Sequence, residues 1–300
     1  MPRAKALRGP RSMAENRTVL YTFHKVREQC EQANADAWRA FLSMYSPLAA
    51  HLLAMYAPDP SAVQSVWRKT LQRLAENNFE RFRGTARQTE REFLADVRAL
   101  LLETLSQPVA PTSASDAAPA RATEPDGANN AKLTPESLAR LLEGLPLLHQ
   151  EMVFFKLAGY SENSIEKMLR VATRVAEKSF ERLSPDHAAA AKIEKDRCPW
   201  PTEWLGILQQ ARAAKKENCA ELHQILRIHD GQVSWYDKEP VEKHASGCLY
   251  CLERWTALRE VGYWRKAAPA VSAAQIEEGL RALGLGAPKG RKSFLQRMFG

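Results

Sequence analysis

The chain has 300 residues, a formal net charge of +8 and five cysteines. No apolar run approaches the roughly 20 residues that a helix needs to span a bilayer, and the basic first residues lack the apolar stretch of a secretory signal. A small, odd number of cysteines does not fit the disulfide framework of a secreted protein, so we expect a cytoplasmic protein without a membrane segment.

The composition favours helices over strands. Ala, Leu, Glu, Arg and Gln dominate, and the chain has only 14 glycines. We therefore predict an all-α fold with two small helical domains joined by a flexible linker and a small helical domain after them. The positive charge suits an acidic partner such as nucleic acid, and an ordinary solvated surface explains it equally well.

The first helical domain is predicted over residues 18–106, after a disordered basic arm formed by residues 1–17. Its longest periodic stretch repeats apolar side chains at intervals of three and four residues, which predicts one buried helix face. These side chains are Trp38, Phe41, Leu42, Tyr45, Leu48, Leu52 and Met55. Residues 107–131, rich in Pro, Ala and Ser, then predict the flexible linker.

The second helical domain is predicted over residues 132–184. Thr134 followed by Pro135 is a typical helix start. Residues 161–183 have the pattern of a helix, a short turn near residues 170–172 and another helix. This pattern predicts a helix-turn-helix unit.

The last helix of this unit carries a basic stripe with one cation every four residues. The cations are Arg170, Arg174, Lys178 and Arg182. Phosphate contacts to DNA need such a stripe, and Thr173 and Arg174, near the helix start, have the polar groups needed to contact base edges. An equally good interpretation is a solvated face on which Glu177 and Glu181 form local ion pairs.

The rest of the chain divides into three predicted segments. Residues 185–200 form a connector, and residues 201–265 form a third helical unit. Residues 266–300 form a tail that contains an amphipathic helix over residues 272–286 and a basic end. We expect the basic end to be an ordinary solvated terminus.

The third unit contains an imidazole and two thiols at close spacing. Cys248 follows His244 by four residues, and Cys251 follows Cys248 by three. If residues 240–255 form one helix that begins at Pro240, successive residues are rotated by about 100°. All three side chains then lie on the same face of the helix. Such a set of donors is typical of a site for Zn²⁺.

A structural zinc site needs a fourth ligand, and Cys219, 25 residues before His244, is the best candidate. It lies in a stretch that we expect to be helical. His223, His229 and Cys198 are weaker candidates. The alternative is a group of ordinary buried cysteines beside a surface histidine. Zinc is favoured because three of the five cysteines fall within one short unit together with His244. A small helical unit also has little core, so a metal would supply much of its folding free energy.

The spacing of Cys219, His244, Cys248 and Cys251 resembles that of the zinc-binding anti-sigma domain, over about residues 215–256. The resemblance implies a small helical domain that binds a sigma factor and blocks its contacts with RNA polymerase. In some members of that family the thiolates are oxidised and the metal is lost, which releases the sigma factor. A structural zinc without redox sensing is the simpler expectation.

The two preceding domains resemble the extracytoplasmic-function sigma factors. The resemblance is carried by Leu145–Pro146, by Glu151 and by the stretch GYSENSIEKML. It implies that the first domain binds the RNA polymerase core, here with Gln64 and Trp67, and that the second domain binds promoter DNA.

Some positions depart from the sigma-factor pattern. The acidic residues expected beside Gln64 are absent, and Phe93 is the only aromatic residue in the helix that would melt the promoter. Arg170 stands where a turn glycine is usual, and Glu177, which would repel phosphate, stands where a lysine is usual.

From these features we expect a sigma-like transcription regulator that is autoinhibited when its zinc domain docks onto the first two domains of the same chain. The alternative is a degenerate sigma-like scaffold that binds partner proteins and does not initiate transcription. A zinc enzyme is the least favoured interpretation, because four protein ligands leave no open position for water.

Overall fold

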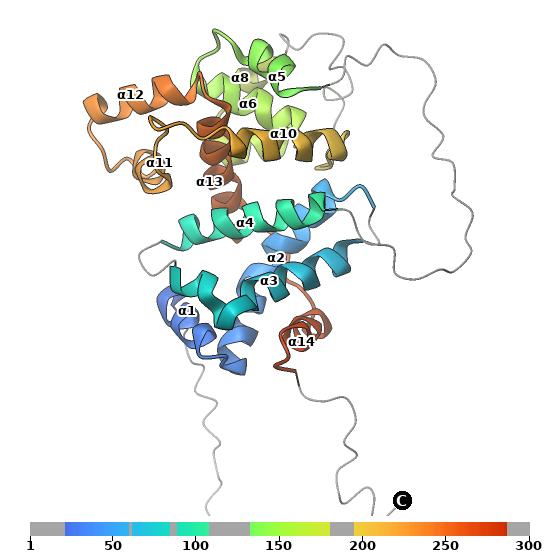
Figure 1. Ribbon diagram of the computed structural model, residues 1–300. Helices are drawn as coiled ribbons and strands as arrows, with labels where there is room; N and C mark the ends of the chain where they lie inside the picture. The colour runs from blue at the N-terminus through green and yellow to red at the C-terminus, as the bar shows by residue number, and fades with distance from the viewer. Residues whose placement is uncertain (1–21, 60–61, 85–88, 108–132, 181–194, 287–300) are drawn as a thin grey trace, which may run out of the picture.

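The structure is a computed structural model that describes residues 22–59, 62–84, 89–107, 133–180 and 195–286. Within these ranges every regular element is an α-helix, which confirms the predicted all-α fold (Figure 1). Four predicted features lie wholly or largely outside them: the basic arm, the linker over residues 107–131, most of the connector over residues 185–200, and the basic end of the tail.

The first segment contains four helices: α1 (Phe23–Glu31), α2 (Ala35–Tyr56), α3 (Ala62–Gly84) and α4 (Glu90–Ser106). All seven apolar side chains predicted to form one face of α2 are buried. Side-chain caps fix the helix starts, since Asn34 accepts from the backbone of Asp36 at 2.9 Å and Thr89 forms a capping box with Glu92.

The second segment contains α5 (Pro135–Leu142), α6 (Leu147–Leu157), α7 (Glu162–Leu169) and α8 (Thr173–Phe180). Thr134 and Ser161 cap α5 and α7 as their sequence positions predict. Helices α7 and α8 form the predicted helix-turn-helix unit, with the turn after Leu169. Arg170 occupies that turn with φ of 56°, in the left-handed region that favours glycine.

This backbone geometry gives a first testable expectation. Replacing Arg170 with glycine should raise the free energy of unfolding by roughly 1 kcal/mol, because glycine adopts a positive φ without steric cost. The matched change Lys178→Gly, in helical backbone, should lower it by about 0.5–1 kcal/mol. Urea unfolding curves measure both changes. A loss of stability in the Arg170 variant would mean that its side chain contributes more than the strain costs.

The third segment contains α10 (Pro201–Ala213), α11 (Leu222–His229), α12 (Trp235–Ala245) and α13 (Leu249–Ala267). The prediction of one helix over residues 240–255 is wrong. Helix α12 begins at Trp235, where Ser234 accepts from the backbone of Asp237, so that Pro240 lies inside the helix. The chain turns at residues 246–247, and Cys248 has an extended backbone.

The predicted amphipathic helix of the tail is confirmed as α14 (Ala273–Ala282). It packs against α2 and α3 (Figure 1). The close approach depends on Gly279, because a Cβ atom there would lie 2.8 Å from a methyl carbon of Leu42. The sequence predicted the helix and gave no indication of what it would pack against.

Helix α13 joins the parts of the fold. It contacts α2 and α4 of the first segment, α6 and α7 of the second, and α10, α11 and α12 of its own segment. Apolar side chains of α13, among them Leu252, Val261 and Trp264, belong to one buried cluster with residues of all of these segments. Whether each segment folds by itself is a separate question, so the division into domains stays a prediction.

A buried ionic network reinforces this packing. Arg98 of α4 donates to Glu253 of α13 at 2.7 Å and also to Glu260, about two turns further along the same face of α13. The hydroxyl groups of Tyr56 and Tyr160 donate to Glu260 as well. Because Arg98, Glu253 and Glu260 are at most 2% exposed, none of these charges has water as an alternative partner.

Candidate metal centre

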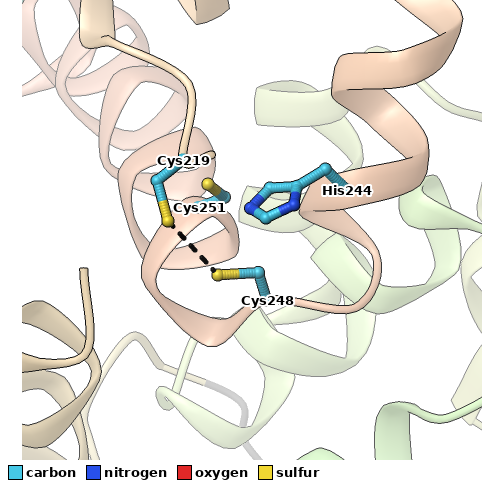
Figure 2. Close-up of side chains that lie close together, drawn as sticks. All are labelled: Cys219, His244, Cys248 and Cys251. Atoms are coloured by element: carbon cyan, nitrogen blue, oxygen red, sulfur yellow. Dashed lines mark hydrogen bonds between the residues drawn. The ribbon is translucent and has the colours of Figure 1, made fainter. Parts of the chain in front are cut away.

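Four side chains with metal-binding atoms meet at one point of the third segment. Cys219 comes from the turn before α11, and His244 from the last turn of α12. Cys248 is the residue before α13, and Cys251 lies in its first turn. Their ligand atoms all lie within 4.8 Å of one another, so this group could hold a metal ion (Figure 2).

The local backbone produces this convergence in a different way from the one expected. The thiols and the imidazole do not share a helix face, because the chain reverses at residues 246–247. His244 ends one helix and the two cysteines begin the next, so the side chains approach from two directions (Figure 2). Cys219 approaches from a third direction and lies in a turn, which makes its predicted helical setting wrong.

Backbone amides point at two of the sulfur atoms. The amide of Lys216 donates to Sγ of Cys219 at 3.2 Å, and the amide of Ala220 donates to Cys251. The start of α13 adds the positive end of a helix dipole beside Cys248 and Cys251. All of these contacts favour a negatively charged sulfur, which is the form that binds metal ions.

The thiols of the centre lie close together and disfavour the charged form of Cys251. Burial, together with the neighbouring thiols of Cys248 and Cys219, raises the pKa of Cys251 to about 12. The sulfur atoms of Cys219 and Cys248 are 3.8 Å apart. A bound cation would replace the thiol protons and remove the repulsion between the thiolates.

His244 has one ring nitrogen free to bind a metal ion. Its Nε2 atom is buried and has no hydrogen-bond partner among the described residues. Its Nδ1 atom lies 3.4 Å from the side-chain amide of Asn218. With the amide oxygen of Asn218 turned to accept from Nδ1–H, the lone pair of Nε2 is available to a cation, and the ring orientation is fixed.

The weaker candidates for the fourth ligand lie elsewhere. His223 is exposed on α11, and the ring of His229 packs edge-on against Trp255 with centroids 4.7 Å apart. Cys198 belongs to the large buried cluster, where burial raises its pKa to about 12. None of the three belongs to the group of four, whereas Cys219, the preferred candidate, does.

The residues predicted to contact polymerase and DNA lie away from this centre. On α3, Gln64 is exposed and Trp67 half-buried, and both line a groove that α14 also lines. Arg170, Arg174 and Lys178 are exposed at the helix-turn-helix unit. Thr173 begins α8, but its side chain lies outside the described part of the structure, as does Arg182.

The charged residues of the buried network were not predicted from the sequence. Glu253 and Glu260 are seven residues apart on α13, so they share the face that carries buried apolar side chains. Two carboxylates on such a face were a usable signal for a buried cationic partner. That the partner is Arg98 depends on tertiary packing.

Comparison with known proteins adds no identification: no family model, curated protein or solved structure matches this chain. Among the helices of the described ranges, none has the length and apolar character required to cross a membrane. The cytoplasmic location stays a prediction.

Proposed function

We propose that Cys219, His244, Cys248 and Cys251 bind one structural Zn²⁺ ion. Three thiolates and one imidazole are a common ligand set of tetrahedral structural zinc sites. Soft sulfur ligands also disfavour Mg²⁺ and Ca²⁺, which prefer oxygen. The single observation that carries this proposal is the mutual distance of 4.8 Å or less among the four ligand atoms. Four protein ligands fill the coordination shell, so a catalytic zinc is not proposed.

We infer further that the protein is a sigma-like transcription regulator whose polymerase-binding face is covered by its own C-terminal segment. The sigma-factor resemblance assigns that face to Gln64 and Trp67. In the structure these two residues line one groove with Gln275, Glu278 and Gly279 of α14. A polymerase helix that used this face would therefore have to displace α14.

Specific contacts hold α14 on this groove. Glu277 accepts from Arg39 of α2 at 3.1 Å, and Glu278 accepts from Arg68 of α3 at 3.0 Å. Both ion pairs are about half exposed, so each contributes little by itself. Most of the attachment therefore comes from the apolar face around Gly279, which contacts Leu42 and Leu71. Such a modest attachment suits a cover that a partner can replace.

The zinc centre would act on this cover through α13. Its first turn carries Cys251, its middle carries Glu253 and Glu260 bound to Arg98 of α4, and its end leads within a few residues to α14. A helix fixed at both the metal and the buried network keeps α14 at a high local concentration beside its groove. Loss of the metal would release the first of these two attachments.

The test of this proposal is the change Gly279→Glu. A carboxylate forced against Leu42 and Leu71 should detach α14. We then expect the affinity for RNA polymerase core to rise about tenfold or more. A tenfold rise corresponds to removing a competing contact of about 1.4 kcal/mol. Gly206→Glu is the matched control, because a Cβ atom at Gly206 would have no neighbour within 4 Å. Pull-down with purified polymerase core measures both variants.

Two other results would contradict the proposal in different ways. Equal polymerase binding by wild type and both variants would remove the cover hypothesis. Polymerase binding without promoter-dependent initiation in a transcription assay would favour the alternative function, a scaffold that binds partner proteins. The missing acidic residues beside Gln64 are the specific observation in favour of that alternative.

A further inference from the structure

A basic cleft lies beside α13 and shares no lining residue with the groove that α14 lines. It has a volume of about 740 Å³ and is lined by residues of α4, α7, α11 and α13 and by Arg170 of the helix-turn-helix turn. This volume is in the range of sites that hold small organic ligands. Six cationic side chains line it: Arg91, Lys167, Arg170, Arg259, Arg265 and Lys266.

Carboxylates neutralise three of these six cations. Arg91 donates to Asp230 at 2.6 Å, and Arg265 donates to Glu90 at 2.8 Å. Arg259 donates to the buried Glu151 at 3.1 Å. These three arginines are between 27% and 29% exposed, so they hold the walls of the cleft together and still face its interior.

The other three cations have no carboxylate partner in the described part of the chain. Lys167 and Arg170 are exposed at the end of α7, and Lys266 is exposed at the end of α13. A cation in the last turn of a helix also complements the helix dipole. The helix dipoles explain why each of these cations lies at a helix end. They do not explain why two such helix ends and Arg91 meet at one cleft.

One further observation favours an anionic ligand. Arg170 keeps a long cationic side chain at a φ of 56°, where glycine would avoid strain. The cleft therefore carries more positive charge than its own carboxylates neutralise.

We propose that this cleft binds a phosphate-bearing ligand. Several cations that converge from different elements match the distributed charge of a polyphosphate group, and guanidinium groups bind phosphate oxygens with two hydrogen bonds at once. A single carboxylate would neutralise only one of the three unpaired cations. Because the walls come from all three segments, a bound ligand would hold α4, α7 and α13 together. This proposal does not depend on the proposed transcriptional function.

The test is titration of the full-length protein with inorganic triphosphate by calorimetry at low ionic strength, where screening is weakest. Lys167→Ala combined with Lys266→Ala removes two unpaired cations from the cleft. We expect its dissociation constant for triphosphate to rise about tenfold or more, as for the loss of two charge-assisted contacts. Triphosphate should also raise the melting temperature of the wild type and not that of this variant.

Lys69→Ala combined with Lys238→Ala is the matched control, because it removes the same formal charge from α3, where Lys69 is exposed, and from α12, where the Lys238 side chain is 42% exposed. This control should bind triphosphate as the wild type does. Equal weakening in both double variants, or no binding by the wild type, would overturn the proposal.

Duplex DNA added to the wild-type complex identifies the source of the phosphate: displacement assigns it to a nucleic-acid backbone, and no displacement assigns it to a free polyphosphate ligand.

Discussion

Replacing Cys251 with serine is expected to abolish high-affinity zinc binding and to destabilise the third segment strongly. A structural zinc site contributes about 10–16 kcal/mol of apparent binding free energy. If the four ligands share this about equally, the loss of one thiolate costs on the order of 3 kcal/mol or more. The effect extends beyond the metal, because Cys251 lies in the first turn of α13, which contacts helices of all three segments.

The control for this change is Cys198→Ser. Cys198 is also a buried thiol, and it lies outside the group of four. We expect Cys198→Ser to keep its zinc and to lose only the smaller free energy associated with burying a hydroxyl group. Thermal unfolding with and without a chelator measures both variants. A Cys251 variant that unfolds like the wild type under both conditions would contradict a structural role for the metal.

Replacing Arg98 with alanine is expected to cost about 3–5 kcal/mol, because it leaves buried carboxylates without their cation. Glu253 retains Arg212 at 2.7 Å, whereas Glu260 retains, among the residues that the structure describes, only the two tyrosine hydroxyls. The matched control Lys238→Ala breaks an exposed ion pair with Glu242 and should cost less than about 1 kcal/mol. Urea unfolding at neutral pH separates the two variants. Equal costs would contradict a central role for the network.

The pH dependence of stability gives this network a second readout. Burial alone would raise the pKa of Glu253, but Arg212 and Arg98 hold it at about 2. A carboxyl group whose pKa is lower in the folded state stabilises the protein above the pKa of the unfolded chain. The wild type should therefore lose this contribution as the pH falls from about 4.5 to about 2. The Arg98 variant lacks part of the stabilisation of ionised Glu253 already at neutral pH. Its free energy of unfolding should therefore fall less over that pH interval.

Local signals accounted for the features that the sequence predicted correctly. The periodic face of α2 needs only the spacing of its apolar residues, and the starts of α5 and α7 need only Thr134 and Ser161. Each of these signals acts within one helical turn or along one helix. The metal ligands were found for a similar reason, since residue type and spacing limit which side chains can share an ion.

The incorrect and missed features depend on contacts between distant segments. The single helix expected over residues 240–255 satisfied the spacing of three ligands, but α12 starts after its N-cap Ser234 and ends before the turn at residues 246–247, which sets His244 against Cys248 and Cys251. The partners of Glu260 come from residues at least 100 positions away. The contact of α14 with α2 depends on the absence of a side chain at Gly279. No local pattern encodes these pairings.

The most direct test of the account is the metal content of the full-length protein purified without chelator. The arrangement of Cys219, His244, Cys248 and Cys251 predicts one zinc ion per chain by elemental analysis and none in Cys248→Ser prepared in parallel. A wild-type protein that contains no zinc, and takes up none when Zn²⁺ is supplied under reducing conditions, would contradict the central claim.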